Sequence, residues 1–195
     1  MRWLPAAVLV LLPACQKEAP KSEMATPPAS VETGPAKGST EWKIQNAMSG
    51  GPEKIAANAT IMDWGATPEA EPTQLRAGSN SWTCFPDMPD TPANDPVCAD
   101  PVVVRMFQAW MGKKPFHTTV AGVSYMLQGG AHVSNTDPFK MAPDSGEQWI
   151  TEPPHLMLVD PNPRSLDSLS TDPANGGPFV MWKGTPYAHV MVPVQ

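Results

Sequence analysis

Two His-x-Met pairs are the residues of this sequence whose types and spacing point most directly to chemistry. They are His155-x-Met157 and His189-x-Met191, and both lie in apolar runs typical of buried strands. Residues two apart in a strand share one face of the sheet. Imidazole combined with a soft thioether is a ligand set that favours copper. If the two strands are neighbours, we expect these four side chains to converge on a copper ion.

The same pairs also have a structural interpretation. Methionine is a common filler of protein cores, and a histidine in a sheet usually bonds to the backbone. The other two histidines, His117 and His132, lie in unrelated contexts. A third hypothesis is an enzyme with a loop-built pocket around His132 and His189, with Tyr187 or an aspartate also available. The sequence assigns no catalytic residue to such an enzyme.

Most catalytic motifs are missing from the sequence. It contains no phosphate-binding Gly-rich loop with its lysine, no H-E-x-x-H string and no dinucleotide-binding fingerprint. The string Gly122-Val123-Ser124-Tyr125-Met126 begins like a nucleophile elbow but lacks the second glycine, and it lies inside a strand pattern. A non-catalytic module is therefore favoured over a hydrolase.

The first of the three cysteines ends the string Leu12-Pro13-Ala14-Cys15. Arg2 and an apolar stretch over residues 3–12, too short to span a bilayer, precede it. The string resembles the lipobox of bacterial lipoproteins, although Pro13 replaces the usual small residue. The resemblance implies a signal peptide over residues 1–14 and a diacylated Cys15 at the mature N-terminus. Gln16 resembles the outer-membrane sorting class, so we expect an outer-membrane lipoprotein facing the periplasm or the exterior, held without a transmembrane helix.

The other two cysteines, Cys84 and Cys98, then form a pair in an oxidising compartment. We expect a structural disulfide between them, whose short loop contributes about 3 kcal/mol in the chain-entropy picture. A redox pair or a metal-thiolate site is the alternative, but the sequence has no C-x-x-C spacing.

The charge of the chain restricts its partners. Removing residues 1–14 takes away Arg2 and leaves 12 basic against 19 acidic residues, a formal charge of −7. Because binding to nucleic acid requires a basic patch, nucleic acid is excluded as a partner. The membrane is expected to hold the protein only through the lipid, and a protein or small-molecule ligand is left open.

Composition and patterning predict one loop-rich domain behind a tether. Prolines number 25 of 195 residues, well above the usual share of about 5%. Residues 15–40 read as a lipidated, disordered tether and residues 41–195 as a single globular domain. We expect short helices over residues 40–48, 52–58 and 101–113; the first has an N-cap at Ser39 or Thr40, and the last, which is the clearest, has Asp100 as N-cap, Pro101 at its first position and one apolar stripe. Strands are expected over 60–64, 118–127, 155–159, 179–182 and 187–192, together with an extended segment within 74–85 that turns at residues 78–80. The fold class is α+β, with a small, largely antiparallel sheet, two or three short helices and one disulfide.

Aspartate before proline recurs and predicts defined turns, because aspartate bonds its own backbone and proline fixes φ. A calcium site built by Asp87, Asp90, Asn94 and Asp95 is the alternative, but the spacing matches no EF-hand loop. The polar segments 128–138 and 170–178 are interpreted as ordered surface loops rather than as a binding site.

Four short strings resemble a family of exported bacterial proteins. They cover residues 82–86, 94–98, 125–130 and 184–189, and the resemblance implies no activity. The leading hypothesis is therefore an envelope-anchored, non-catalytic binding or structural module. A periplasmic copper-binding protein that uses the His-x-Met pairs is the alternative.

Overall fold

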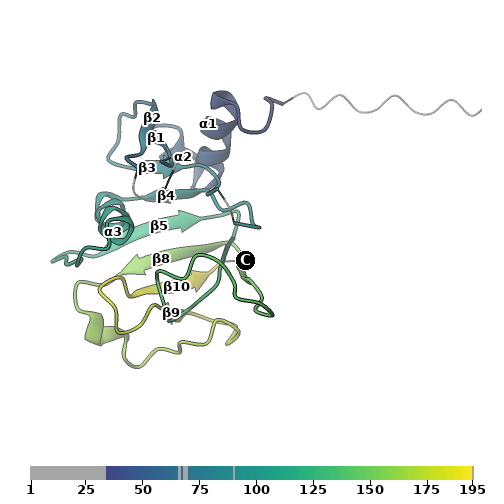
Figure 1. Ribbon diagram of the computed structural model, residues 1–195. Coiled ribbons are helices and arrows are strands. Elements are labelled where there is room, and N and C mark those ends of the chain that lie inside the picture. The colour runs from purple at the N-terminus through teal and green to yellow at the C-terminus, as the bar shows by residue number, and fades with distance from the viewer. Residues whose placement is uncertain (1–33, 66, 68–69, 90, 195) are drawn as a thin grey trace, which may run out of the picture. The chain divides into compact units, whose positions relative to one another are not determined.

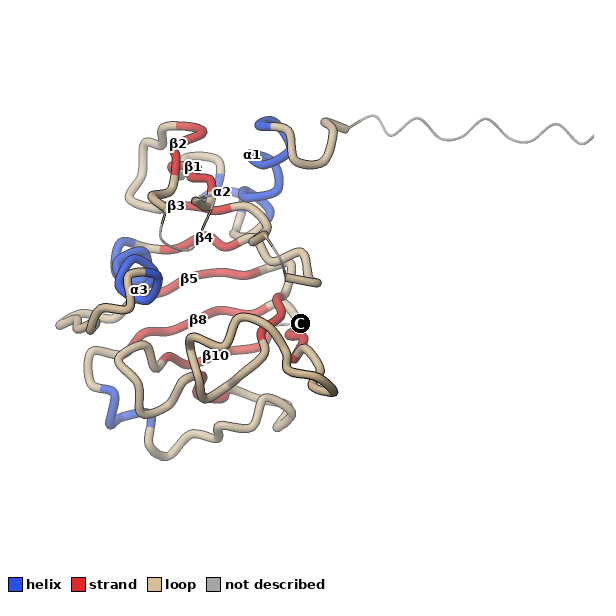
Figure 2. The backbone as a smooth tube through the Cα atoms, in the orientation of Figure 1, coloured by secondary structure: helices blue, strands red, loops and turns tan. Residues whose placement is uncertain are grey.

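The computed structural model describes residues 34–194, apart from residues 66, 68–69 and 90. The predicted signal peptide, the lipidated Cys15 and most of the predicted tether lie outside these described residues. Among the described residues are three α-helices and one 3-10 helix (Figures 1 and 2): α1 (Thr40–Ser49), α2 (Glu53–Ala56), α3 (Pro101–Met111) and η1 (Pro163–Leu166). No helix in this part of the chain is both long and apolar enough to cross a membrane.

The described part of the chain also forms ten strands: β1 (Thr60–Asp63), β2 (Thr73–Arg76), β3 (Thr83–Phe85), β4 (Val97–Ala99), β5 (Gly122–Met126), β6 (Gly130–His132), β7 (Ile150–Glu152), β8 (His155–Val159), β9 (Phe179–Met181) and β10 (His189–Pro193). Eight of them form one sheet in the order β2-β1-β3-β4-β5-β8-β10-β9, and β6 pairs with β7 separately. Within the large sheet only β1 and β3 are parallel neighbours. The predicted α+β class with a largely antiparallel sheet is confirmed.

The predicted disulfide is present at the centre of the first half of the sheet. Cys84 in β3 and Cys98 in β4 lie directly opposite each other, with their Cα atoms 4.0 Å apart. The side chains of both cysteines are fully buried, together with Ile61 and Ala47 of α1. Helix α1 begins where predicted, because the Ser39 hydroxyl accepts a hydrogen bond from the backbone N–H of Trp42.

Helix α3 starts three residues after Cys98 and confirms the clearest helix prediction. The Asp100 carboxylate accepts hydrogen bonds from the backbone N–H groups of Val102 and Val103, and Pro101 occupies the first helical position. The other oxygen of Asp100 accepts from the N–H of Val123 in β5, which fixes the helix to the sheet. The apolar stripe of α3 packs against one face of the sheet.

Strand alternation divides the side chains of β5, β8, β9 and β10 between two faces. Directly paired residues share a face, so Met157 lies on the same face as its partners Ser124 and Met191. His155 and His189 lie two residues from Met157 and Met191 in their strands and therefore point to this face as well. Helix α3 and the segment between β5 and β8 cover this face (Figure 1). Strands β4, β6 and β7 are additional to the sequence prediction, and the predicted strand over 118–127 is shorter, as β5.

Candidate functional site

A cavity of about 130 Å³ lies between this face of the sheet, α3 and the segment that carries β6 and β7. Its walls are mostly apolar. Six of the twelve methionines of the chain line it: Met88, Met126, Met141, Met157, Met181 and Met191. Aromatic side chains complete the walls: Trp64, Phe107, Trp110, Trp149 and Trp182. This volume is close to that of the engineered apolar cavity of about 150 Å³ that binds benzene.

The residues predicted to bind copper lie on neighbouring strands and on one face. Met157 and Met191 are directly opposite each other, and together with His189 they line the cavity. His155 instead pairs with Pro193, at the other end of the β8–β10 ladder from His189. The partner of His189 across β9 and β10 is Met181, which also lines the cavity. The structure therefore brings His189 together with three methionines and places His155 elsewhere.

The His189 side chain is fully buried and holds one nitrogen free. Its Nδ1 lies 2.8 Å from the carbonyl oxygen of Tyr187, so Nδ1 must donate a proton, and the lone pair is on Nε2. This Nε2 is buried and has no hydrogen-bond partner among the residues that the structure describes. Burial lowers the pKa of His189 to about 4. The rings of His189 and Trp182 are nearly perpendicular, with their centroids 5.3 Å apart.

Glu152 of β7 lies between two further histidines. Its Oε1 is 3.3 Å from Nδ1 of His132, and its Oε2 is 3.8 Å from Nε2 of His155. Burial raises the pKa of Glu152 to about 8, and burial together with the charges of His189 and His155 lowers the pKa of His132 to about 4. Burial also lowers the pKa of His155. Near neutral pH this group therefore consists of a protonated carboxyl and neutral imidazoles rather than ion pairs.

We call His132, Glu152, His155 and His189 the histidine cluster. Of seven buried side-chain nitrogen and oxygen atoms without a hydrogen bond in the described residues, five belong to this cluster; two of the five, Glu152 Oε1 and His132 Nδ1, lie 3.3 Å apart but lack hydrogen-bond geometry. Such atoms are rare in native proteins and destabilise the fold, which makes them markers of a bound ligand, ion or water. Nowhere in the described residues do three His, Cys, Asp or Glu side chains gather closely enough to bind a metal ion. A metal at the cavity would therefore require methionine sulfur.

Two tryptophans fix the cover of the cavity. The backbone N–H and the indole N–H of Trp182 donate to the carbonyls of Asn135 and Ser134, at 2.8 and 3.0 Å. The indole of Trp110 donates to the carbonyl of Pro138, and the two indoles stack with centroids 5.6 Å apart. Trp182 has a φ of 54°, a conformation that a bulky residue adopts only when its surroundings enforce it. The segment 128–138, interpreted above as a surface loop, thus forms the cavity cover.

Gly129 and Gly130 allow this segment to approach the sheet. Gly129 has a φ of 86°, and a Cβ there would lie 2.5 Å from the carbonyl oxygen of Glu152. A Cβ on Gly130 would lie 3.2 Å from the methyl carbon of Met126 and 3.6 Å from the ring of His155. Both glycines are needed to bring His132 and Glu152 together.

Of the remaining sequence candidates, Asp95 of the disulfide loop lines the cavity, whereas His117 and Tyr187 do not. His117 is exposed, and the hydroxyl of buried Tyr187 donates to the carbonyl of Lys114 at 2.7 Å, a structural role. Sequence reasoning missed Glu152, Met181 and Trp182. The available signals were the carboxylate of Glu152 three residues before His155, and the place of Met181 opposite His189 across the predicted hairpin.

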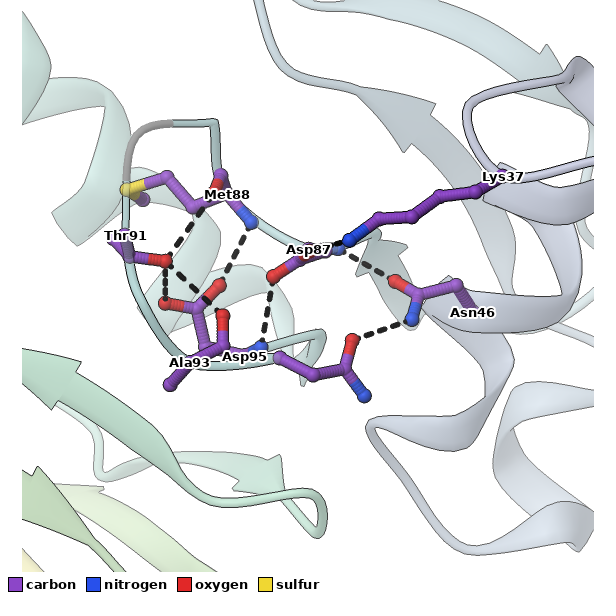
Figure 3. A network of polar contacts seen from close by, with 8 residues as sticks. Lys37, Asn46, Asp87, Met88, Thr91, Ala93 and Asp95 are labelled. Carbon is purple, nitrogen blue, oxygen red and sulfur yellow. Dashed lines mark hydrogen bonds and ion pairs between the residues drawn. The ribbon is translucent and has the colours of Figure 1, made fainter.

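The disulfide loop carries a second polar cluster, which we call the loop network (Figure 3). The buried Asp95 carboxylate accepts hydrogen bonds from the N–H of Met88 at 2.7 Å and from the hydroxyl of Thr91 at 2.8 Å. The Asp87 carboxylate accepts from the N–H of Asp95, and Asn46 of α1 accepts from the N–H of Asp87. Burial raises the pKa of Asp95 to about 6.

Both carboxylate oxygens of Asp95 are thus engaged by the loop's own groups, as turn chemistry requires, whereas the second oxygen of Asp87 lies 4.0 Å from the Lys37 ammonium. Asp90, a further candidate for the calcium alternative, lies outside the described residues.

Comparisons of this chain with protein-family models, with curated proteins and with solved structures gave no match. Its function is therefore inferred from the geometry of its own residues.

Proposed function

We propose that this chain is an exported, lipid-anchored and non-catalytic binding module of the bacterial envelope. Its ligand is a small group that accepts lone pairs, either a hydrogen-bond donor or a cation, bound in the cavity beside the histidine cluster. The observation that carries the proposal is that His132, Glu152 and His189 line a mostly apolar cavity and each has a buried polar atom without a hydrogen-bond partner in the described residues. Such a combination of apolar walls and few convergent polar groups is typical of ligand sites.

The polar atoms also indicate the chemistry of the ligand. The Nε2 atoms of His155 and His189 carry lone pairs and so accept hydrogen bonds or bind cations, because the Nδ1 of each ring donates its proton to a backbone carbonyl. A ligand that supplies a proton donor or positive charge replaces the missing partners, whereas an anion would meet lone pairs. Within the part of the chain that the structure describes, the hydroxyl of Ser124, the nearest match to a catalytic nucleophile motif, has no hydrogen-bond partner that could act as an activating base.

The anchor is tested on the mature protein isolated from a bacterial envelope. Mass spectrometry is expected to find a diacylated Cys15 as the first residue, and Cys15→Ser is expected to release the protein from the membrane fraction. A mature protein that starts elsewhere without lipid would overturn the lipobox interpretation.

Binding is tested with indole, an apolar ring that carries one N–H donor. We expect saturable binding by calorimetry, quenching of the cavity tryptophans' own fluorescence where it can be resolved, and a rise in Tm. Ala131→Leu, which adds bulk to the cavity wall, is expected to abolish binding, whereas Ala57→Leu at an exposed position is the control. Native mass spectrometry of the untreated protein searches for a retained ligand or ion. Absence of both indole binding and a retained ligand or ion would refute the proposal.

A further inference from the structure

We propose that His189, Met181 and Met191 form a binding site for Cu(I) in the wall of the cavity, with Met157 beside them. This inference rests on the proposed function, because it takes the same cavity as the binding site and names the class of its ligand. It differs from the ligand set expected from the sequence: Met181 of β9 replaces His155.

The imidazole of His189 is prepared as a metal ligand. The carbonyl oxygen of Tyr187 holds the proton on Nδ1 at a distance of 2.8 Å, which leaves the Nε2 lone pair available. A hydrogen bond from the second ring nitrogen to a backbone carbonyl is the usual means by which proteins orient a metal-binding histidine. His189 is only 1% exposed, and no group in the described residues donates a hydrogen bond to its Nε2. The lone pair is therefore removed from water without gaining a partner from the protein.

The sheet register places the sulfur ligands around His189. Met181 is its direct partner on β9, and direct partners in an antiparallel pair have Cβ atoms about 5 Å apart. Met191 is two residues further along β10 on the same face, and Met157 is the direct partner of Met191 on β8. All four side chains line the cavity. One imidazole is therefore bordered by three thioethers in a buried apolar wall.

This donor set selects a soft monovalent ion. Thioether sulfur favours Cu(I), whereas hard divalent ions prefer carboxylate and carbonyl oxygen. All of these ligands are neutral, so a bound ion of single charge has less desolvation to overcome than a divalent ion. The indole of Trp182, whose ring centroid lies 5.3 Å from that of His189, adds an aromatic wall that excludes water from the site.

A path to the site is also present. Met141 lines the cavity and is 49% exposed, whereas Met181 and Met191 are only 5% and 2% exposed. Met88, also at the cavity, belongs to the disulfide loop. The cavity that holds His189 is thus lined by both exposed and buried thioethers, which offer an entering ion ligands of one chemical type.

The test is an anaerobic titration of the folded protein with Cu(I), supplied as its acetonitrile complex and measured in competition with bathocuproine disulfonate. We expect one tightly bound Cu(I) per chain, with X-ray absorption reporting sulfur and nitrogen ligands together. Ag(I), which has the same charge and ligand preference, is expected to bind in air and to shift the His189 ring signals in NMR spectra. Zn(II) is expected not to compete.

Four variants localise the site. Met181→Leu and Met191→Leu keep the volume and apolar character of the side chain and remove the sulfur. His189→Asn keeps a donor toward the Tyr187 carbonyl and removes Nε2. Each is expected to weaken Cu(I) binding by about tenfold or more, in the range found when metal-site residues are altered. Met106→Leu, a buried methionine outside the cavity lining, is the matched control and is expected to bind like the wild type.

The outcomes separate this inference from the function on which it rests. Absence of Cu(I) binding, or binding that all three site variants leave unchanged, overturns the copper site. If indole binding persists in the same preparation, the binding module stands and only its ligand class is refuted. Loss of indole and Cu(I) binding together, with no retained ligand, refutes both.

Discussion

The loop network and the histidine cluster are both groups of buried polar side chains, yet they are built in opposite ways. In the loop network, both oxygens of Asp95 accept hydrogen bonds, from the N–H of Met88 and the hydroxyl of Thr91. In the histidine cluster, five nitrogen and oxygen atoms have no partner within the described residues. A satisfied polar group stabilises a fold, whereas an unsatisfied one lowers its stability.

The backbone shows the same contrast. The disulfide loop is closed by a covalent bond between directly opposed strands and by turn hydrogen bonds. Beside the cavity, Trp182 is held at a positive φ by its hydrogen bonds to residues 134 and 135. Strain and unmet hydrogen bonds persist together where a protein retains a function at the expense of stability. The comparison assigns a structural role to the first region and a binding role to the second.

The largest expected effect is the loss of the disulfide. The Cys84→Ala/Cys98→Ala double variant removes a link between residues separated by 14 positions. We expect the free energy of unfolding, measured by urea denaturation, to fall by about 3 kcal/mol. The folded fraction is expected to bind indole and Cu(I) as before, because the cysteines do not line the cavity. If the folded fraction also lost its affinity for the ligands, the disulfide region would have a role in binding, which would contradict the separation of the two regions.

Asp95→Ala tests the satisfied cluster itself. The change leaves the N–H of Met88 and the hydroxyl of Thr91 without their acceptor, and we expect a loss of about 2 kcal/mol in urea denaturation. Asp95→Asn is the control, because its carbonyl retains one bond and the Thr91 hydroxyl can accept the other. An alanine variant as stable as the asparagine variant would contradict the structural role of the loop network.

The elements that local patterns determine were predictable from the sequence. Asp100-Pro101 followed by an apolar stripe predicted α3, and an N-cap at Ser39 or Thr40 predicted α1. Cys84 and Cys98 could be paired because only one partner remained for each. In all these cases the decisive contacts lie within a few residues or involve a unique pair.

The arrangement of the site was less predictable, because it depends on strand register. Strands β8 and β10 are neighbours, as the copper hypothesis for the His-x-Met pairs required. The register, however, places His155 at the other end of the ladder from His189 and brings Met181 to His189 instead. Glu152 reaches His132 only through the pairing of β6 with β7, two three-residue strands without an apolar pattern. Such pairing is decided by distant contacts, which a single sequence does not display.

Glu152→Gln tests the electrostatics of the histidine cluster. Burial raises the pKa of Glu152 to about 8, so the folded state holds this proton more tightly than the unfolded chain. Binding of this proton by the Glu152 carboxyl therefore stabilises the folded state. The stabilisation is fully present below the ordinary pKa of 4.5 and is lost as the pH rises through about 8. Relative to Glu152→Gln, the wild type is expected to lose at least about 1.4 kcal/mol, the value of one pKa unit, between pH 5 and 8.

Glu147→Gln is the matched control for this pH dependence. Glu147 is exposed, and hydrogen bonds from Lys140 and from the N–H of Asp144 lower its pKa. The stabilising effect of Glu147 is therefore lost on acidification, opposite in sign to that of Glu152. Urea denaturation at each pH measures both differences. A stability difference between wild type and Glu152→Gln that does not change with pH would show that the carboxyl is solvated.

The smallest expected effect has the opposite sign to that of Asp95→Ala. The Ser124 side chain is fully buried on the cavity face of β5, and its hydroxyl has no partner in the described residues. Replacing an unsatisfied hydroxyl by a methyl group removes a buried polar atom and breaks no bond. We therefore expect Ser124→Ala to be neutral or to raise the free energy of unfolding by up to about 1 kcal/mol.

Ser39→Ala provides the same chemical change at a satisfied hydroxyl. Ser39 caps α1 by accepting from the N–H of Trp42, so its loss is expected to destabilise the protein by about 1 kcal/mol. Urea denaturation of the two variants side by side measures the difference in sign. If Ser124→Ala destabilised the protein as much as Ser39→Ala does, the Ser124 hydroxyl would have a partner such as a bound water. The contrast between satisfied and unsatisfied polar groups would then be confined to the histidine cluster.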